Sequence, residues 1–155
     1  MNLQEQKLLE LLELNINSSN LLIRKSVSSA LSELNNGNSI SVTKNIPVKE
    51  FFSKLPKEVK LCRIFALKAN TKSKIERHTN SYQRTLTLYG EGDTKILENN
   101  MWKSNVRKSS GGSMEDKWLS VPENTWHQPI ALSSDWVTVT FHTASESEII
   151  DEYKD

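Results

Sequence analysis

The hydrophobic pattern of the chain changes once, near residue 39, and this change limits the folds open to it. In residues 1–38 leucines recur at helical spacing in two groups separated by Asn17-Ser18-Ser19, which predicts two amphipathic helices. Beyond residue 39 apolar and polar residues alternate along short runs, as in half-buried strands. A chain of 155 residues fits one domain. We therefore predict a mainly β protein, with a helical segment over 1–38 packed on an antiparallel barrel or sandwich over 39–155.

The clearest alternating runs lie at 61–67, 85–89 and 137–141, and each predicts a strand. Gly37 suits the left-handed position that ends a helix, so it is expected to stop the second helix. The Gly-rich run from Gly90 to Asp93 predicts a turn between two strands.

Two segments lack this alternation. Residues 103–117 contain Ser109-Ser110-Gly111-Gly112-Ser113, which predicts a long mobile loop, and we expect it to act as a lid over the barrel mouth. The acidic tail over 146–155 is expected to form a short helix whose apolar side packs on the body.

Composition excludes several classes of function. The 20 Lys and Arg against 19 Asp and Glu form no concentrated basic face, so nucleic acid is not an expected partner. The longest apolar stretches are a few residues, too short to span a membrane, and the N-terminus has no signal-peptide pattern. A single cysteine, Cys62, excludes an internal disulfide and favours a buried structural thiol. We therefore expect a cytoplasmic protein.

Histidine is scarce, and its three copies all lie in the second half of the chain, at His78, His127 and His142. On a strand, alternate residues share a face, so Glu76, His78 and Asn80 are expected to point the same way. By the same rule His142 shares a face with Thr138 and Thr140. These positions predict a pocket lined by imidazole.

The sequence around His127 resembles a motif of the cupin superfamily, Pro-x-Gly-x-x-His. Pro122, Asn124 and His127 match its spacing, with Asn in place of Gly, a change that keeps access to the left-handed backbone conformation.

The other cupin motif is a Gly, five residues, His-x-His, three or four residues, Glu, six residues and Gly, and the match to it is divergent. His78 takes the first His and Asn80 stands at the second. The Glu position then falls on Thr85 or Arg84, and Gly92 lies at the closing Gly.

This resemblance, over roughly residues 60–143, implies a double-stranded β-helix, an antiparallel jelly-roll barrel with a ligand pocket in its mouth. In metal-dependent cupins three His and a Glu hold the ion. His78 and His127 match two of these ligands, His142 is our candidate for a third nitrogen, and Gln83 or Glu76 is a candidate oxygen donor. Fe²⁺ is the first expectation for the metal, with Ni²⁺, Mn²⁺ and Zn²⁺ as alternatives.

A small organic ligand is expected beside the metal. Candidate ligand-binding residues are Asn80, Gln83, Arg84, Tyr82 and Trp126, since guanidinium pairs with carboxylate or phosphate and aromatic walls suit small organic molecules. For Arg84 an outward-facing charge on the strand is the competing interpretation.

Two functions remain open at this point. The first is a metal-dependent dioxygenase, and the second is a metal-free cupin that acts as a sugar-nucleotide isomerase or epimerase, or as a small-molecule sensor. The leucine-rich front is compatible with a homodimer.

Overall fold

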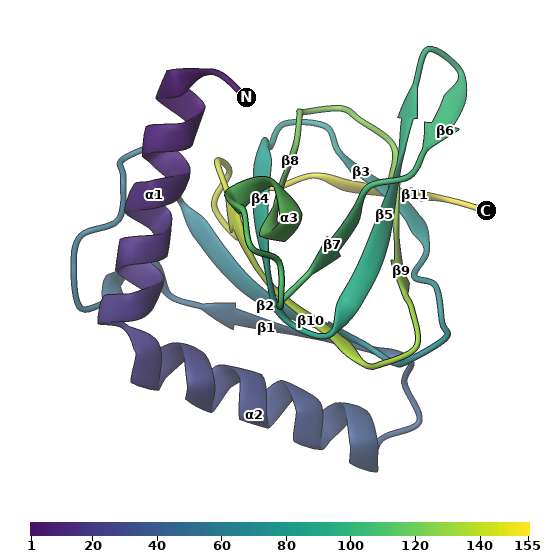
Figure 1. Cartoon of the computed structure of the whole chain (residues 1–155), viewed down its shortest axis with the longest axis horizontal. Coiled ribbons are helices and arrows are strands. Elements are labelled where there is room, and N and C mark those ends of the chain that lie inside the picture. Colours follow the sequence, from purple (N-terminus) through teal and green to yellow (C-terminus); the bar gives the residue numbers. More distant parts are fainter.

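The computed structural model describes residues 1–155, and the chain begins with two helices that meet at a corner (Figure 1). α1 spans Leu3–Ser18 and α2 spans Asn20–Asn36, so the two predicted helices and the break between them are confirmed. The Asn2 side chain caps α1 by accepting a hydrogen bond of 2.8 Å from the backbone N–H of Glu5. No helix has both the length and the hydropathy needed to cross a lipid bilayer.

Gly37 ends α2, but not in the left-handed conformation that we predicted. Its φ of −99° and ψ of 174° are extended. A Cβ at this position would lie 2.8 Å from the carbonyl oxygen of Glu33. The absence of a side chain is therefore what allows the Gly37 N–H to donate to that carbonyl at 2.9 Å.

The rest of the chain is built of two antiparallel sheets (Figure 1), which confirms the predicted mainly β jelly roll with helices at its front. The first sheet has the order β1-β2-β10-β4-β8 and the second β11-β3-β9-β5-β6, with β7 paired to β5. The first sheet contains β1 (Ser41–Ile46), β2 (Leu61–Leu67), β4 (Gln83–Tyr89), β8 (Trp118–Val121) and β10 (Trp136–His142). The second contains β3 (Ile75–His78), β5 (Glu91–Glu98), β6 (Met101–Lys103), β7 (Val106–Lys108), β9 (His127–Ala131) and β11 (Asp151–Lys154). A 3₁₀ turn, η1 (Val48–Glu50), follows β1.

The largest hydrophobic core lies between the two helices and the outer face of the first sheet. Leucines of α1 and α2 share this core with alternate residues of β2 and β10. The residues between them on the same strands face the barrel interior, because side chains of a strand alternate between its two faces. The outward set is Cys62, Ile64, Ala66, Val137, Val139 and Phe141, and the inward set is Arg63, Phe65, Trp136, Thr138, Thr140 and His142.

The predicted turn after β4 is shorter than expected. Within this turn Gly90 alone has a positive φ, of 74°, and β5 begins at the next residue. Gly92 lies inside β5, where a Cβ would come within 2.1 Å of the Trp136 ring. The indole of Trp136 therefore packs directly on the backbone of Gly92, and its Nε1 donates to Thr87 at 3.2 Å.

The segment 103–117 is not the structureless lid that we expected. It contains β7 and the short helix α3 (Met114–Lys117), which begins with a capping box between Ser113 and Asp116. Met114 packs against the large core. No residue of this segment lines the barrel cavity, since β7 and α3 are held against β5 and β8.

The C-terminal segment forms a strand in place of the expected helix. β11 pairs antiparallel with β3, so that Asp151 lies opposite His78. The side chain of Asn80 fixes the approach to this strand, because its Oδ1 accepts from the Ile150 N–H at 2.9 Å and its Nδ2 donates to the Glu148 carbonyl at 2.8 Å. The free edge of β3 offers backbone hydrogen bonds to this segment. A helix of so few residues would be unstable on its own, so pairing as a strand is favoured.

Cys62 is fully buried in the large core, and burial raises the pKa of its thiol. Because the thiolate is the reactive form, we expect native protein to react with a water-soluble thiol reagent orders of magnitude more slowly than protein in guanidinium. A reaction in the native protein as fast as in the denatured one would contradict this packing.

Replacing Gly92 with Ala should destabilise the protein by about 1–3 kcal/mol, since the added methyl would overlap the Trp136 ring. Gly112 is the matched control, because a Cβ there would meet no atom within 4 Å. Chemical denaturation of Gly92→Ala and Gly112→Ala measures both effects, and equal stability of the two variants would refute this role of Gly92.

Candidate metal centre

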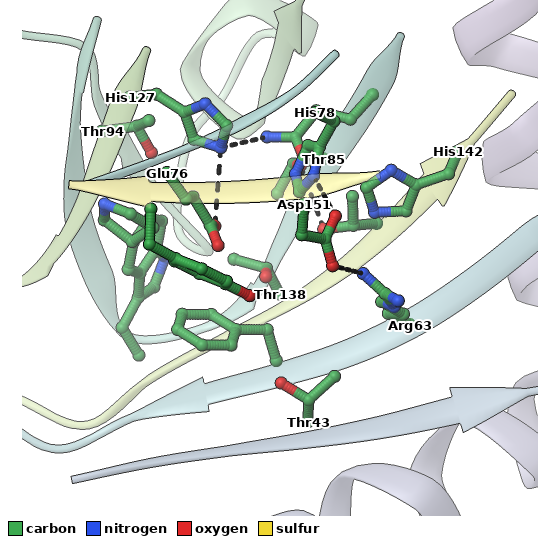
Figure 2. A pocket seen from close by; sticks show the side chains of 16 residues that line it. Thr43, Arg63, Glu76, His78, Thr85, Thr94, His127, Thr138, His142 and Asp151 are labelled. Carbon is green, nitrogen blue, oxygen red and sulfur yellow. Dashed lines mark hydrogen bonds and ion pairs between the residues drawn. The ribbon is translucent and has the colours of Figure 1, made fainter. Parts of the chain in front are cut away.

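A cavity of about 120 Å³ lies inside the barrel, between the two sheets (Figure 2). Only 3 of its 16 lining residues are hydrophobic, because the inward positions of the strands carry threonine, histidine and charged side chains. Ten of the lining residues are labelled in Figure 2: Thr43, Arg63, Glu76, His78, Thr85, Thr94, His127, Thr138, His142 and Asp151.

Three side chains at this cavity bring their metal-binding atoms together. One donor atom each from Glu76, His78 and His127 lies within 4.8 Å of the other two. Glu76 and His78 are two residues apart on β3 and so share its inner face. His127 on β9 is the direct cross-strand partner of Glu76. The barrel topology thus places a carboxylate and two imidazoles on one wall.

The hydrogen bonds of His127 determine which of its nitrogens faces the cluster. Its Nδ1 lies 2.9 Å from the carbonyl oxygen of Thr125, and a carbonyl can only accept, so Nδ1 carries the hydrogen. The lone pair of Nε2 then faces Glu76 Oε1 at 3.5 Å and accepts from the Gln83 amide at 3.4 Å. No protein group donates a hydrogen bond to the Glu76 carboxylate, which is 22% exposed, so its oxygens are available to a proton, a water molecule or a metal ion.

His78 is oriented by the C-terminal strand. Its Nδ1–H donates to Asp151 Oδ1 at 2.7 Å, and the other oxygen of Asp151 lies 3.7 Å from Nη1 of Arg63 (Figure 2). This leaves the lone pair of His78 Nε2 free. A carboxylate that accepts from the second nitrogen of a ligating histidine fixes its tautomer and raises its basicity.

His142 also lines the cavity, on the other side of His78. The two rings are perpendicular, with centroids 4.9 Å apart, and His142 Nδ1 lies 3.3 Å from the Ser81 hydroxyl. Burial, followed by electrostatic interactions with His78 and Arg63, holds the pKa of His142 well below its ordinary value, so the ring is neutral. His142 is not part of the group of donor atoms within 4.8 Å of one another. The third donor atom of that group belongs to Glu76, one of the two candidate oxygen donors, and not to His142.

Of the five predicted ligand-binding residues, only Gln83 lines the cavity. Arg84 alternates with it on β4 and therefore faces α1, where its guanidinium pairs with both oxygens of Glu5 at 2.8 and 3.0 Å. Tyr82 stacks under that guanidinium, 4.3 Å from ring centroid to Cζ. The interpretation of Arg84 as an outward charge is therefore the correct one.

Trp126 and Asn80 lie outside the cavity as well. Trp126 packs under two cations, Arg77 at 4.5 Å and Lys154 at 4.7 Å from its ring centroid. Asn80 follows the end of β3, so the alternation of side chains along the strand no longer sets its direction. Its side chain instead hydrogen-bonds to the C-terminal segment.

The structure fits a register of the first cupin motif two residues earlier than the one predicted above. Glu76 and His78 stand at His-x-His, and Gln83 stands at the Glu position after four residues. Gly90 follows six residues later, and Asn70 lies at the opening Gly. Asn70, Gly90 and Asn124, at the three Gly positions of the two motifs, have positive φ angles of 57°, 74° and 56°. Asn124 thus adopts the left-handed conformation predicted for it.

Sequence reasoning offered Glu76 only as one of two candidate oxygen donors, and it missed Arg63 and Asp151 at this cavity. The spacing of Asn70 and Gly90 around Glu76-Arg77-His78 was the available signal for Glu76. The position of Asp151 depends on the pairing of β11 with β3, for which the sequence carries no local signal.

No protein-family model and no curated protein sequence matches the chain. Solved structures do resemble it. Oxalate oxidase in complex with the substrate analogue glycolate has a TM-score of 0.57 and 13% identity, over 74% of this chain and 56% of that chain. The coconut allergen cocosin and the pro-11S globulin of pumpkin each have a TM-score of 0.58 and 13% identity, over 76% of this chain and 29% of theirs.

The chain therefore spans about half the length of oxalate oxidase and under a third of the globulins. At 13% identity the similarity establishes the fold alone. These neighbours are cupins, and the chain accordingly has the cupin fold, the double-stranded β-helix that its motifs predicted.

Proposed function

We propose that this protein binds a divalent metal ion through Glu76, His78 and His127 and uses it to act on a small polar molecule in the barrel cavity. The observation that carries the proposal is the contact between Glu76 and His127. A carboxylate oxygen lies 3.5 Å from an imidazole nitrogen whose hydrogen is on the other ring atom. A shared cation removes the repulsion between these two lone pairs, and the nearby His78 supplies a further nitrogen.

The donor set suits the chemistry of a non-haem iron centre. Two histidines and one carboxylate with open positions are typical of Fe(II) oxygenases, and a bound Fe²⁺ would supply O₂ activation. We therefore favour a metal-dependent dioxygenase. Thr125 orients the ring of His127, and Asp151 orients the ring of His78. The Gln83 amide is close enough to donate a hydrogen bond to His127. With its oxygen turned inward, the same amide could bind the ion.

The size of the cavity argues against one of the alternatives. A sugar nucleotide is much larger than the about 120 Å³ available, since pockets for such molecules measure several hundred Å³. A molecule of a few carbon and oxygen atoms fits. The similarity to an oxalate oxidase studied with glycolate supports this size class. A metal-free sensor of small molecules is the remaining alternative, and metal uptake decides between them.

Cytoplasmic location and homodimer formation remain predictions. The exposed apolar side chains at which a homodimer would form are those of the helical front and the loop beside it, in particular Leu14, Leu21 and Phe52.

Metal uptake by untagged protein tests the proposed centre. We expect close to one equivalent of Fe²⁺ or Zn²⁺ per chain, measured by elemental analysis and by calorimetric titration under anaerobic conditions. Glu76→Gln and His127→Gln should each weaken binding by about 100-fold or more, because even the loss of an outer hydrogen-bond partner costs about 10- to 100-fold.

Two further variants sharpen this experiment. Glu98→Gln changes an exposed carboxylate that pairs with Lys103 and should bind metal normally. His142→Gln should also retain the metal, whereas an all-histidine site predicts its loss. Wild-type protein that stays empty when offered Fe²⁺ would refute the proposed function.

Nitric oxide tests whether the centre has open positions. If the three protein ligands leave room for O₂, the Fe²⁺-loaded protein should bind nitric oxide and give the paramagnetic resonance signal of a ferrous nitrosyl. Iron that is held but does not bind nitric oxide would indicate a closed, structural site.

A further inference from the structure

Arg63 is a cation inside the barrel whose donors the protein leaves largely unused. It lies on β2 between Cys62 and Ile64, which face the helices, and therefore points into the cavity. Its side chain is only 18% exposed. Nε donates to Asn45 at 3.1 Å, but the two terminal NH₂ groups make no hydrogen bond to the protein, and the nearest carboxylate oxygen, of Asp151, is 3.7 Å away. A charged group that is mostly removed from water gains from a hydrogen-bond acceptor, and the two NH₂ groups of Arg63 are available to pair with one in a ligand.

Asp151 does not meet this need. Its Oδ1 is 2.7 Å from His78 Nδ1, and only the longer contact of its other oxygen is directed at Arg63 (Figure 2). Figure 2 also shows Arg63 on the opposite side of Asp151 from the pair formed by Glu76 and His127. The Arg63 guanidinium and the candidate metal ligands therefore lie at two separate places on the wall of the cavity.

The charges around the cavity favour a negative ligand. Glu76 and Asp151 contribute two negative charges and Arg63 one positive charge, and a divalent ion adds two. With neutral histidines the sum is one positive charge, which a single carboxylate would balance. Hydroxyls of Thr43, Thr94 and Thr138 also line the cavity and make no hydrogen bond to protein groups, so they can donate to ligand oxygens.

We propose that the cavity binds a short organic monoanion, whose carboxylate pairs with Arg63 while a second oxygen reaches the metal bound by Glu76, His78 and His127. This rests on the proposed metal centre for its second contact and for the net positive charge of the cavity. Guanidinium binds a carboxylate through two parallel hydrogen bonds, and the volume of about 120 Å³ limits the ligand to a few carbon atoms.

Glycolate and its neutral amide, glycolamide, form a matched pair of probes of nearly equal size. Calorimetric titration of Zn²⁺-loaded protein, which is redox-inert, should show glycolate binding about 10- to 100-fold more tightly than glycolamide, as expected for hydrogen bonds to a charged partner. Arg63→Gln should abolish this preference while retaining Zn²⁺, and Arg63→Lys should restore part of it. Arg24→Gln removes an exposed arginine of α2 and should keep the full preference.

The outcomes separate this inference from the proposed function. Equal binding of the two probes by Zn²⁺-loaded wild type, or a preference that survives in Arg63→Gln, overturns the carboxylate site and leaves the metal centre standing. If the wild type takes up no Zn²⁺, the metal centre fails, and the same pair is titrated against metal-free protein. A glycolate preference that depends on Arg63 then supports the anion site, whereas equal binding refutes it.

Discussion

The packing of α1 and α2 against the outer face of the first sheet supplies the apolar burial on which the rest of the structure depends. Strand alternation directs one set of side chains on β2 and β10 to this core and leaves the other set inside the barrel. Because the main hydrophobic core lies outside the barrel, between the helices and the first sheet, the wall of the cavity can consist of threonines, histidines and charged residues. The polar cavity is thus a consequence of where the hydrophobic core lies.

Within that cavity the main constraint is electrostatic. Cross-strand pairing sets Glu76 opposite His127, and the Thr125 carbonyl turns the lone pair of His127 toward the carboxylate. Asp151, a residue near the C-terminus, orients His78 in the same way by accepting a hydrogen bond from its Nδ1. Backbone and carboxylate acceptors therefore orient both imidazoles, and a donor atom of each lies within 4.8 Å of the other and of a Glu76 oxygen.

Much of the fold could be predicted from local pattern, because helical spacing in residues 1–38 and alternation along β2, β4 and β10 are properties of contiguous residues. The candidate site was predicted in part: the candidate donors His78, His127, His142, Gln83 and Glu76 all line the cavity, but the motif register was displaced by two residues. A glutamate at a histidine position and an asparagine at a glycine position concealed the match at Glu76 and Asn70. Arg84 and Asn80 were misplaced because their surroundings, α1 and the C-terminal segment, come from distant parts of the chain.

X-ray absorption spectroscopy at the metal edge of zinc- or iron-loaded protein tests the central claim most directly, because it reports the atoms bound to the ion. Two imidazole nitrogens and at least one carboxylate oxygen are expected for the wild type, and a spectrum with one imidazole fewer is expected for His78→Gln. A first shell of three imidazoles, or of oxygens alone, would contradict a centre built from Glu76, His78 and His127.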